Sequence, residues 1–269
     1  MTRTGRLHAV WLLAFVLASS GCATVEKPDP LEKMNRGIFV FNETLDQYAI
    51  APVATAWDFV VPGEVQNAID RFFGNLNMPI VFMNDVLQAK PMAASWDVFR
   101  FVVNSTFGVA GLFDVATHVE IPENDEDFGQ TLGYWGVPQG PYIMLPILGP
   151  SSLRDGTGLI VDTAASSYAY FTPFWLDIVA LSGAETWGAS VGLKAFELMN
   201  LRAIYLEEIE SSRADAFDYY VFVRNAYLQN RRAKVADQKD AAALDDDDLY
   251  YFDEEDGEDL DEEEDYDDL

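Results

Sequence analysis

Apolar residues recur at every third or fourth position in the segment that follows Pro30. They are Leu31, Met34, Ile38, Phe41, Leu45 and Tyr48. This spacing places them on one face of an α-helix. The sequence therefore predicts a helix from Leu31 to Tyr48, with Asp29 as its N-cap and Pro30 in its first turn.

Three further segments of the N-terminal half carry helical patterns. We expect helices over 64–73, 81–87 and 93–106, with a turn over 75–79, which ends in a proline. The segment 93–106 is apolar around almost its whole circumference. A helix of this kind is either buried in protein or faces lipid.

Glycine and proline interrupt residues 107–158, although this region is rich in aliphatic and aromatic side chains. Loops normally face water and are polar, so an irregular apolar region indicates contact with lipid or a buried turn. Residues 158–181 are also mostly apolar, but Asp162 and Pro173 argue against a membrane-spanning helix. We expect a shallowly inserted hairpin there. A single helical pattern then runs from 184 to 233.

Long stretches of alternating apolar and polar residues, which are typical of strands, are missing, and there is no internal repeat. The pattern predicts an all-α fold with a single domain over 31–235. Five tryptophans sit in or beside the interrupted segments, where their rings suit either a membrane interface or an ordinary core. They are Trp57, Trp96, Trp135, Trp175 and Trp187.

The N-terminal residues have the layout of a secretory signal. Arg3 and Arg6 precede an apolar run from Ala9 to Ala18, which is too short to span a bilayer. Cys22 is the only cysteine and directly follows three small residues, a pattern that resembles a bacterial lipobox.

We therefore expect a lipoprotein signal peptide over 1–21, acylation of Cys22 as the new amino terminus, and a lipidated tether over 22–30. An ordinary buried cysteine is the alternative. Ala23, rather than an aspartate, follows the cysteine, so the retention signal of the inner membrane is absent. The predicted location is the periplasmic leaflet of the bacterial outer membrane, through a lipid anchor.

Charge divides the chain into two parts. The net charge is −28, and 17 acidic residues but no basic one lie between Asp245 and Leu269. A block of like charges this dense repels itself and has little to bury. We expect an acidic, disordered tail over 236–269. The rest has no basic excess, which argues against a nucleic-acid partner.

The inventory of reactive side chains is small. His8 lies in the leader, so His118 is the one histidine left for catalysis, and the chain has no Gly-x-Ser-x-Gly motif. One histidine and an acylated cysteine cannot form a zinc site. The tail does not keep the register of a calcium loop. We expect no catalytic residue, no metal site and no cofactor.

Several motifs of the chain resemble those of the MlaA (VacJ) lipoproteins, in order and over roughly 29–232. The similar segments are Asp29–Arg36 with Phe39, Phe41, Asn42 and Asp46; Phe72–Leu76 with Pro79; Asn104–Gly108 with Gly111, Asp114 and Ala116; Phe128–Gly133 with Trp135 and Gly136; Gly140–Tyr142, Leu145, Pro146, Gly149–Ser151, Arg154, Asp155 and Gly158; and Ala226–Arg231.

The resemblance implies a ring-shaped helical domain embedded in one leaflet of the outer membrane, with an amphipathic channel. Through such a channel, misplaced phospholipids would leave the outer leaflet, which maintains lipid asymmetry. It also implies two protein partners, a trimeric outer-membrane porin and a soluble periplasmic lipid carrier. No covalent chemistry is needed for this function.

Within this frame we expect the segment 140–181 to form much of the lipid path. The candidate side chains are Tyr142, Leu145, Ile147, Arg154 and Asp155, the last as a partner of Arg154. The alternative for that pair is a structural salt bridge. Two other functions remain open: a porin-associated structural adaptor, and a lipoprotein hydrolase, which would have to use His118.

Overall fold

The computed structural model describes residues 29–165 and 183–236. Its first helix, α2 (Glu32–Leu45), begins one residue after the predicted start. The N-cap of α2 is Leu31 and it makes no side-chain cap, so the prediction of Asp29 as N-cap was wrong. Asp29 Oδ1 instead accepts a hydrogen bond from the Leu31 backbone N–H at 3.1 Å, just ahead of the helix. A π-helical turn, η1 (Asp46–Ile50), joins α2 to α3 (Ala51–Val60). The predicted N-terminal helix is thus confirmed, and the helical path continues past its expected end.

Helix α4 (Gly63–Leu87) runs without interruption through Pro79, so the prediction of a turn over 75–79 was wrong. A proline inside a helix removes one backbone hydrogen bond, and tertiary contacts compensate here. Asn75 Nδ2 donates to Ser105 Oγ at 2.9 Å and to the Ala110 carbonyl at 3.3 Å. Both acceptors belong to the part of the chain that packs against α4.

Helix α5 (Pro91–Thr106) folds back along α4. Its buried residues are Ala94, Asp97, Arg100 and Asn104, which share one face and are mostly polar. The apolar side chains of the opposite face are exposed. The sequence left two interpretations of this helix open, and the structure shows that its apolar face is not buried in protein.

The glycine-rich middle forms short elements. They are α6 (Val115–His118), α7 (Phe128–Tyr134), strands β1 (Tyr142–Leu145) and β2 (Gly149–Ser152), and α8 (Leu153–Ala165). The strands pair antiparallel, with Tyr142 opposite Ser152 and Leu145 opposite Gly149. The fold is therefore mostly helical but not strictly all-α. Ile147 and Gly149, with φ of 68° and 84°, close this tight turn.

Residues 183–236 form three helices and not the single predicted one: α10 (Gly183–Ile204), α11 (Leu206–Asp215) and α12 (Tyr219–Val235). Asp218 caps α12 by accepting from the Val221 N–H at 3.2 Å. The expected shallow hairpin over 158–181 falls largely outside the described residues. Its first part, up to Ala165, is helical.

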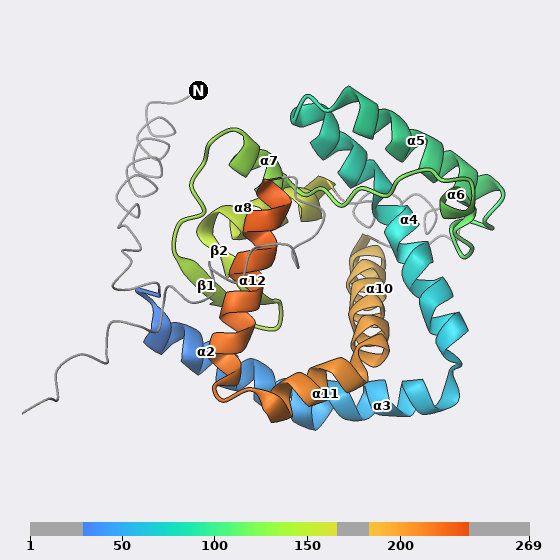
Figure 1. The fold of residues 1–269 in the computed structure, drawn as a ribbon. Coiled ribbons are helices and arrows are strands. Elements are labelled where there is room, and N and C mark those ends of the chain that lie inside the picture. Colours follow the sequence, from blue (N-terminus) through green and yellow to red (C-terminus); the bar gives the residue numbers. More distant parts are fainter. Residues whose placement is uncertain (1–28, 166–182, 237–269) are drawn as a thin grey trace, which may run out of the picture.

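Figure 1 shows α2, α3 and α11 along one edge, with α4 rising from the far end of α3. On the opposite side α12 rises beside the β-hairpin, and α10 stands between α12 and α4 in this view while packing on α3 and α4. The apolar cluster is small and lies where β1 meets α12, around Tyr142, Met144 and Tyr220. None of the helices in the described ranges is long and apolar enough to cross a bilayer.

Candidate functional site

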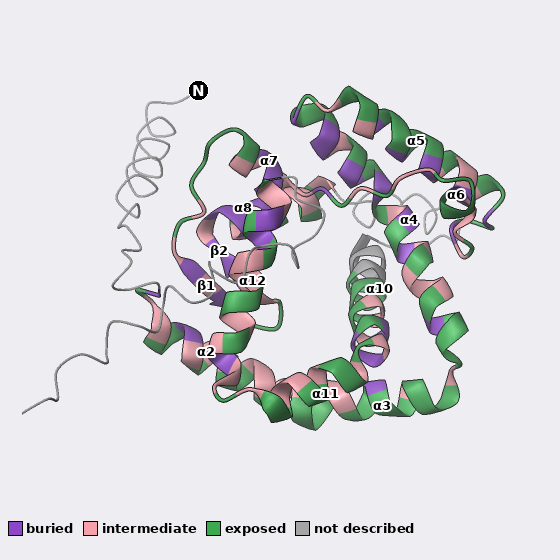
Figure 2. Cartoon of the chain, in the orientation of Figure 1, coloured by how far each residue is buried: buried purple, intermediate pink, exposed green. Residues whose placement is uncertain are grey.

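The described surface is unusually apolar. Large hydrophobic side chains are exposed along α3, α4, α5 and the loops that follow them, and Phe59 keeps 90% of its surface accessible. Examples are Val53, Phe59, Val60, Val65, Phe82, Val86, Met92, Trp96, Phe99, Val102, Phe107, Phe113 and Ile147. Figure 2 shows exposed residues along the same helices. So many exposed apolar side chains mark a surface that contacts another apolar phase or partner.

The interior is polar instead. Asparagine, glutamine, aspartate and arginine side chains outnumber large aliphatic ones among the buried residues that the structure describes. The buried amides and charges include Asn35, Gln66, Asn84, Asp85, Asp97, Arg100, Asn104, Gln130, Arg154, Asp155, Asn200, Arg202 and Arg231. Buried polar groups are stable only when they are hydrogen-bonded, and here they form connected networks.

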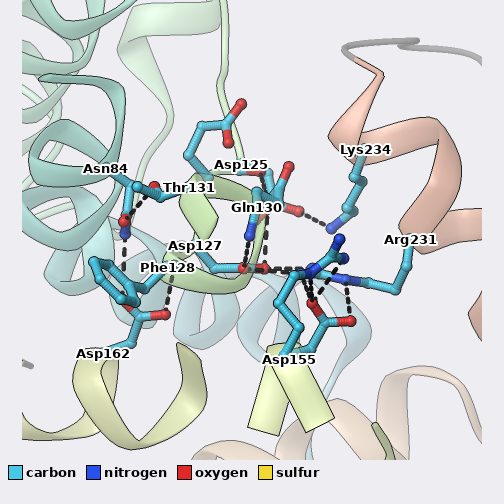
Figure 3. A network of polar contacts seen from close by, with 12 residues as sticks. Asn84, Asp125, Asp127, Phe128, Gln130, Thr131, Asp155, Asp162, Arg231 and Lys234 are labelled. Atoms are coloured by element: carbon cyan, nitrogen blue, oxygen red, sulfur yellow. Dashed lines mark hydrogen bonds and ion pairs between the residues drawn. The ribbon is translucent and has the colours of Figure 1, made fainter. Parts of the chain in front are cut away.

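Arg231, from the last turns of α12, is the centre of one network (Figure 3). Its Nε and Nη2 donate to Asp155 of α8 at 3.1 and 2.9 Å. Its Nη1 and Nη2 donate to Asp127, which precedes α7. Tyr227 Oη adds a hydrogen bond to Asp155 Oδ2 at 2.6 Å. One guanidinium therefore joins three helices.

These contacts hold both aspartates in the charged form. Burial by itself raises the pKa of Asp155, but the hydrogen bonds and charge of Arg231 outweigh it and lower that pKa to about 2. The same opposition of burial and Arg231 lowers the pKa of Asp127. Asp127 also caps α7, because its Oδ1 accepts from the Gln130 N–H at 2.9 Å.

A second branch of the network reaches α4 (Figure 3). Asp162 of α8 accepts from the Phe128 N–H at 2.8 Å and from Asn84 Nδ2 at 3.2 Å. Asn84 Oδ1 in turn accepts from Thr131 Oγ1 at 2.8 Å. Polar side chains thus hold α4, α7 and α8 together where a globular protein commonly uses aliphatic packing.

Two glycines of the resemblance motifs permit this arrangement. A Cβ on Gly158 would lie 2.4 Å from the Gly129 backbone N, and a Cβ on Gly129 would lie 2.7 Å from Arg231 Nη2. A Cβ at position 158 would overlap backbone atoms of α7, so the two backbones can approach only because this position is glycine. Gly129 leaves room for the ends of the Arg231 and Asp155 side chains.

An acidic pair lies between α4 and α5. Asp85 and Asp97 are 1% and 0% exposed, and Asn124 Nδ2 donates to Asp97 Oδ1 at 3.0 Å and to Asp85 Oδ2 at 3.5 Å. Burial, the hydrogen bond to Asp97 and its charge together raise the pKa of Asp85 to about 8. A proton shared by the two carboxyl groups relieves the repulsion between them.

The five residues expected along the lipid path lie close together in the chain but in different surroundings. Tyr142 is buried in the apolar cluster, Leu145 is half-buried, and Ile147 at the hairpin turn is 62% exposed. Arg154 and Asp155 are both buried, and Arg154 Nε donates to Asp155 Oδ1 at 2.9 Å. Contact of any of them with lipid stays a prediction.

Asparagines that the sequence analysis assigned no role hold the β-hairpin. Asn35 Oδ1 accepts from the Met144 N–H at 2.9 Å, and its Nδ2 donates to the Tyr142 carbonyl at 3.0 Å. Seven residues later on the same face of α2, Asn42 donates to the Leu145 carbonyl and accepts from the Ile147 N–H. Two asparagines seven residues apart on one helix face could therefore have indicated that α2 binds the backbone of a strand or turn.

A cavity of about 400 Å³ opens between α10, α11 and α12. Apolar and aromatic side chains form most of its wall, together with one cationic and one anionic residue. The wall consists of Leu198, Leu201, Arg202, Tyr205, Glu208, Ile209, Ser212, Tyr219 and Phe222. The helical pattern over 184–233 gives no sign of this site, because a single continuous helix would bring no two of its segments together.

His118 Nδ1 lies 2.8 Å from the Asp114 carbonyl oxygen at the surface, in the one-turn helix α6. Across residues 29–165 and 183–236, no three histidine, cysteine or acidic side chains cluster as metal ligands.

Comparisons with known proteins agree with one another. The family model described as MlaA lipoprotein matches residues 27–234. The intermembrane phospholipid transport system lipoprotein MlaA of Escherichia coli is 37% identical over 216 residues, which cover 79% of this chain and 80% of that protein. The protein of the same name from Haemophilus influenzae is 34% identical, covering 84% and 90%.

A solved structure has the same fold. It comes from work on the structural basis for maintenance of bacterial outer membrane lipid asymmetry and superposes with a TM-score of 0.62 at 34% identity. The match covers 77% of this chain and 98% of the other. An uncharacterized protein of Rickettsia conorii is also 34% identical, over 80% of both chains.

Proposed function

Because the chain belongs to the MlaA lipoprotein family, we propose that it is an outer-membrane lipoprotein that transports phospholipid. In this proposal it removes mislocalised phospholipids from the outer leaflet through an amphipathic channel. It then transfers them to a soluble periplasmic carrier, and lipid asymmetry is maintained. Relatives with this family's name are described as components of intermembrane phospholipid transport.

The main support for the proposal is that apolar side chains are exposed and polar side chains are buried, the reverse of the distribution in a protein surrounded by water. A protein in water exposes charges and buries aliphatic side chains, whereas this chain exposes Phe59, Val60 and Phe99 and buries Asn84, Asp97 and others. In one leaflet, the exposed apolar side chains would contact acyl chains, and the polar interior would offer hydrogen bonds to headgroups. Helices of this length suit such a position because they need not span the bilayer.

We further propose that α2, α3, α4, α7 and α12 form a ring around the lipid path. The path would include the segment 140–181, with Tyr142, Leu145, Ile147, Arg154 and Asp155 as candidates. Ile147 is the strongest of these because it is exposed at the hairpin turn. The buried pair Arg154–Asp155 would support the ring through the contact of Asp155 with Arg231.

The anchor and partners follow from the same proposal. Cys22 would carry the acyl chains after removal of residues 1–21, and more than one chain is expected because a single chain holds a membrane only marginally. The tether 22–30 would connect them to the helical domain 31–235, with the acidic tail 236–269 beyond it. A trimeric porin and a periplasmic carrier would be the protein partners.

Two measurements test this function. Native mass spectrometry of the detergent-purified protein should detect bound phospholipid. In a strain that lacks its own MlaA lipoprotein, the wild-type chain should lower the amount of surface-exposed phospholipid, and a Cys22→Ala variant should not. If the strain regains asymmetry without any lipid bound to the protein, a structural adaptor for a porin explains the effect better.

A further inference from the structure

The cavity between α10, α11 and α12 is bordered by a cluster of ion pairs with an excess of acid. Arg202 donates to both oxygens of Asp46, at 2.9 and 3.1 Å, and to Glu210 Oε1 at 2.7 Å. Arg213 contacts Asp46, Glu210 and Glu43 at 2.8–2.9 Å. Three carboxylates therefore share two guanidinium groups. The cluster has a net negative charge.

That charge persists over a wide pH range. Burial raises the pKa of Asp46, but the hydrogen bonds of both arginines outweigh burial and lower it. For Arg213, burial lowers the pKa and the three carboxylates raise it well above its usual value. Asp46 and Arg213 therefore stay ionised at neutral pH, and the excess of carboxylates in the cluster repels an additional anion.

One charged group of the cavity wall has no partner among the described residues. The Glu208 carboxylate makes no hydrogen bond or ion pair there, and its residue is exposed at the start of α11. Arg202 also lines the cavity, but its Nη1, which has no acceptor within the described part of the chain, is itself buried and does not reach the cavity surface. The site thus offers one free anionic acceptor, Glu208, in a mainly apolar wall.

Resting on the function proposed above, we propose that this cavity holds the headgroup end of the transported phospholipid and selects a zwitterionic headgroup with a primary ammonium. Glu208 pairs with the ammonium at the mouth of the cavity. Leu201, Ile209 and Phe222 contact the start of the acyl chains. An anionic headgroup without an ammonium is disfavoured, because it adds charge beside the acid-rich cluster.

The experiment is a competition between two lipids. The purified protein in detergent is incubated with equal amounts of palmitoyl-oleoyl phosphatidylethanolamine and palmitoyl-oleoyl phosphatidylglycerol, and the bound lipids are quantified by mass spectrometry. We expect phosphatidylethanolamine to be enriched by about two- to fivefold, the range that an exposed ion pair supplies. Glu208→Gln should abolish the enrichment.

Glu207→Gln is the matched control, because Glu207 is the adjacent exposed carboxylate on α11 and lies outside the cavity wall. It changes the net charge equally and should keep the enrichment. Equal binding of both lipids by the wild type, or unchanged enrichment in Glu208→Gln, overturns the selection while leaving lipid transport intact. Binding of neither lipid overturns both this proposal and the function on which it rests.

Discussion

Arg231 of α12 and Asp155 of α8 form a two-point ion pair across 76 residues of sequence, with donor–acceptor distances of 2.9 and 3.1 Å. Both side chains are buried, and Asp127 completes the coordination of the guanidinium. Because many apolar side chains of this chain are exposed, burial of apolar surface alone does not determine how its helices are arranged. Polar networks of this kind specify which helices meet.

Removal of the Arg231 charge should therefore destabilise the fold. Arg231→Met leaves two carboxylates without their cation, and breaking a buried ion pair from one side costs about 3–5 kcal/mol. The free energy of unfolding, measured by denaturant titration in detergent, should fall by that amount. Arg232→Met is the control, since Arg232 is exposed and should change stability by less than about 0.5 kcal/mol. Equal losses in both variants would contradict this role of the ion pair.

The close approach of α7 and α8 predicts opposite effects of two glycine substitutions. Gly158→Ala forces a methyl group into the Gly129 backbone, and overpacking of this kind costs about 1–3 kcal/mol or more. Gly37→Ala meets open space within α2 and should stabilise the protein by about 0.5–1 kcal/mol. Thermal unfolding of both variants checks the prediction. A neutral Gly158→Ala would show that α7 and α8 can separate without cost.

The acidic pair predicts a specific dependence of stability on pH. The pKa of Asp85 is raised from the model-compound value of 3.8 to about 8 by burial and by Asp97, so the folded state holds a proton that the unfolded state releases. This contribution to stability is fully present below pH 4 and is lost as the pH rises towards 8. Asp85→Asn, which keeps a hydrogen-bond donor at this position, should reduce the decline between pH 4 and 8.

The control for this titration is Asp215→Asn, at an exposed carboxyl group at the end of α11. It should leave the pH profile of the unfolding free energy parallel to that of the wild type. The Asp155–Arg231 pair does not interfere, because the pKa of Asp155 is lowered to about 2 and its contribution is lost only as the pH falls below 4. If wild type and Asp85→Asn have parallel profiles, the pair does not share a proton.

A charge at the hairpin turn should test the lipid path without unfolding the protein. Ile147 has a φ of 68°, where aspartate is tolerated better than a β-branched residue, and its side chain is exposed. Ile147→Asp should raise surface-exposed phospholipid in a complemented strain while the protein level stays normal. Leu145→Asp, at the half-buried position before the turn, should act in the same direction with some loss of stability. Normal asymmetry with both variants would place the path elsewhere.

Most of the helical segments, and the family, could be predicted from the amino-acid sequence alone. Local periodicity suffices for α2 and α5, because the spacing of side chains on a helix is a property of neighbouring residues. The leader, Cys22 and the acidic tail lie outside the described residues and stay predictions. The family motifs were equally visible, although the reason for Asn35, Gly129 or Gly158 was not.

Where helices continue, where they break and which face is buried depend on tertiary contacts. Pro79 does not end α4, because Asn75 and the neighbouring α5 region stabilise the helix around it. The 184–233 pattern breaks at Tyr205 and again before Tyr219, and this places Arg202 and Arg213 beside Asp46. These contacts join residues more than 150 positions apart, and no local pattern encodes which distant partner will satisfy a buried charge. The apolar pattern of α5 likewise does not tell which of its faces is buried, whereas the structure places Asp97 and Arg100 on the inner face and leaves the apolar face exposed.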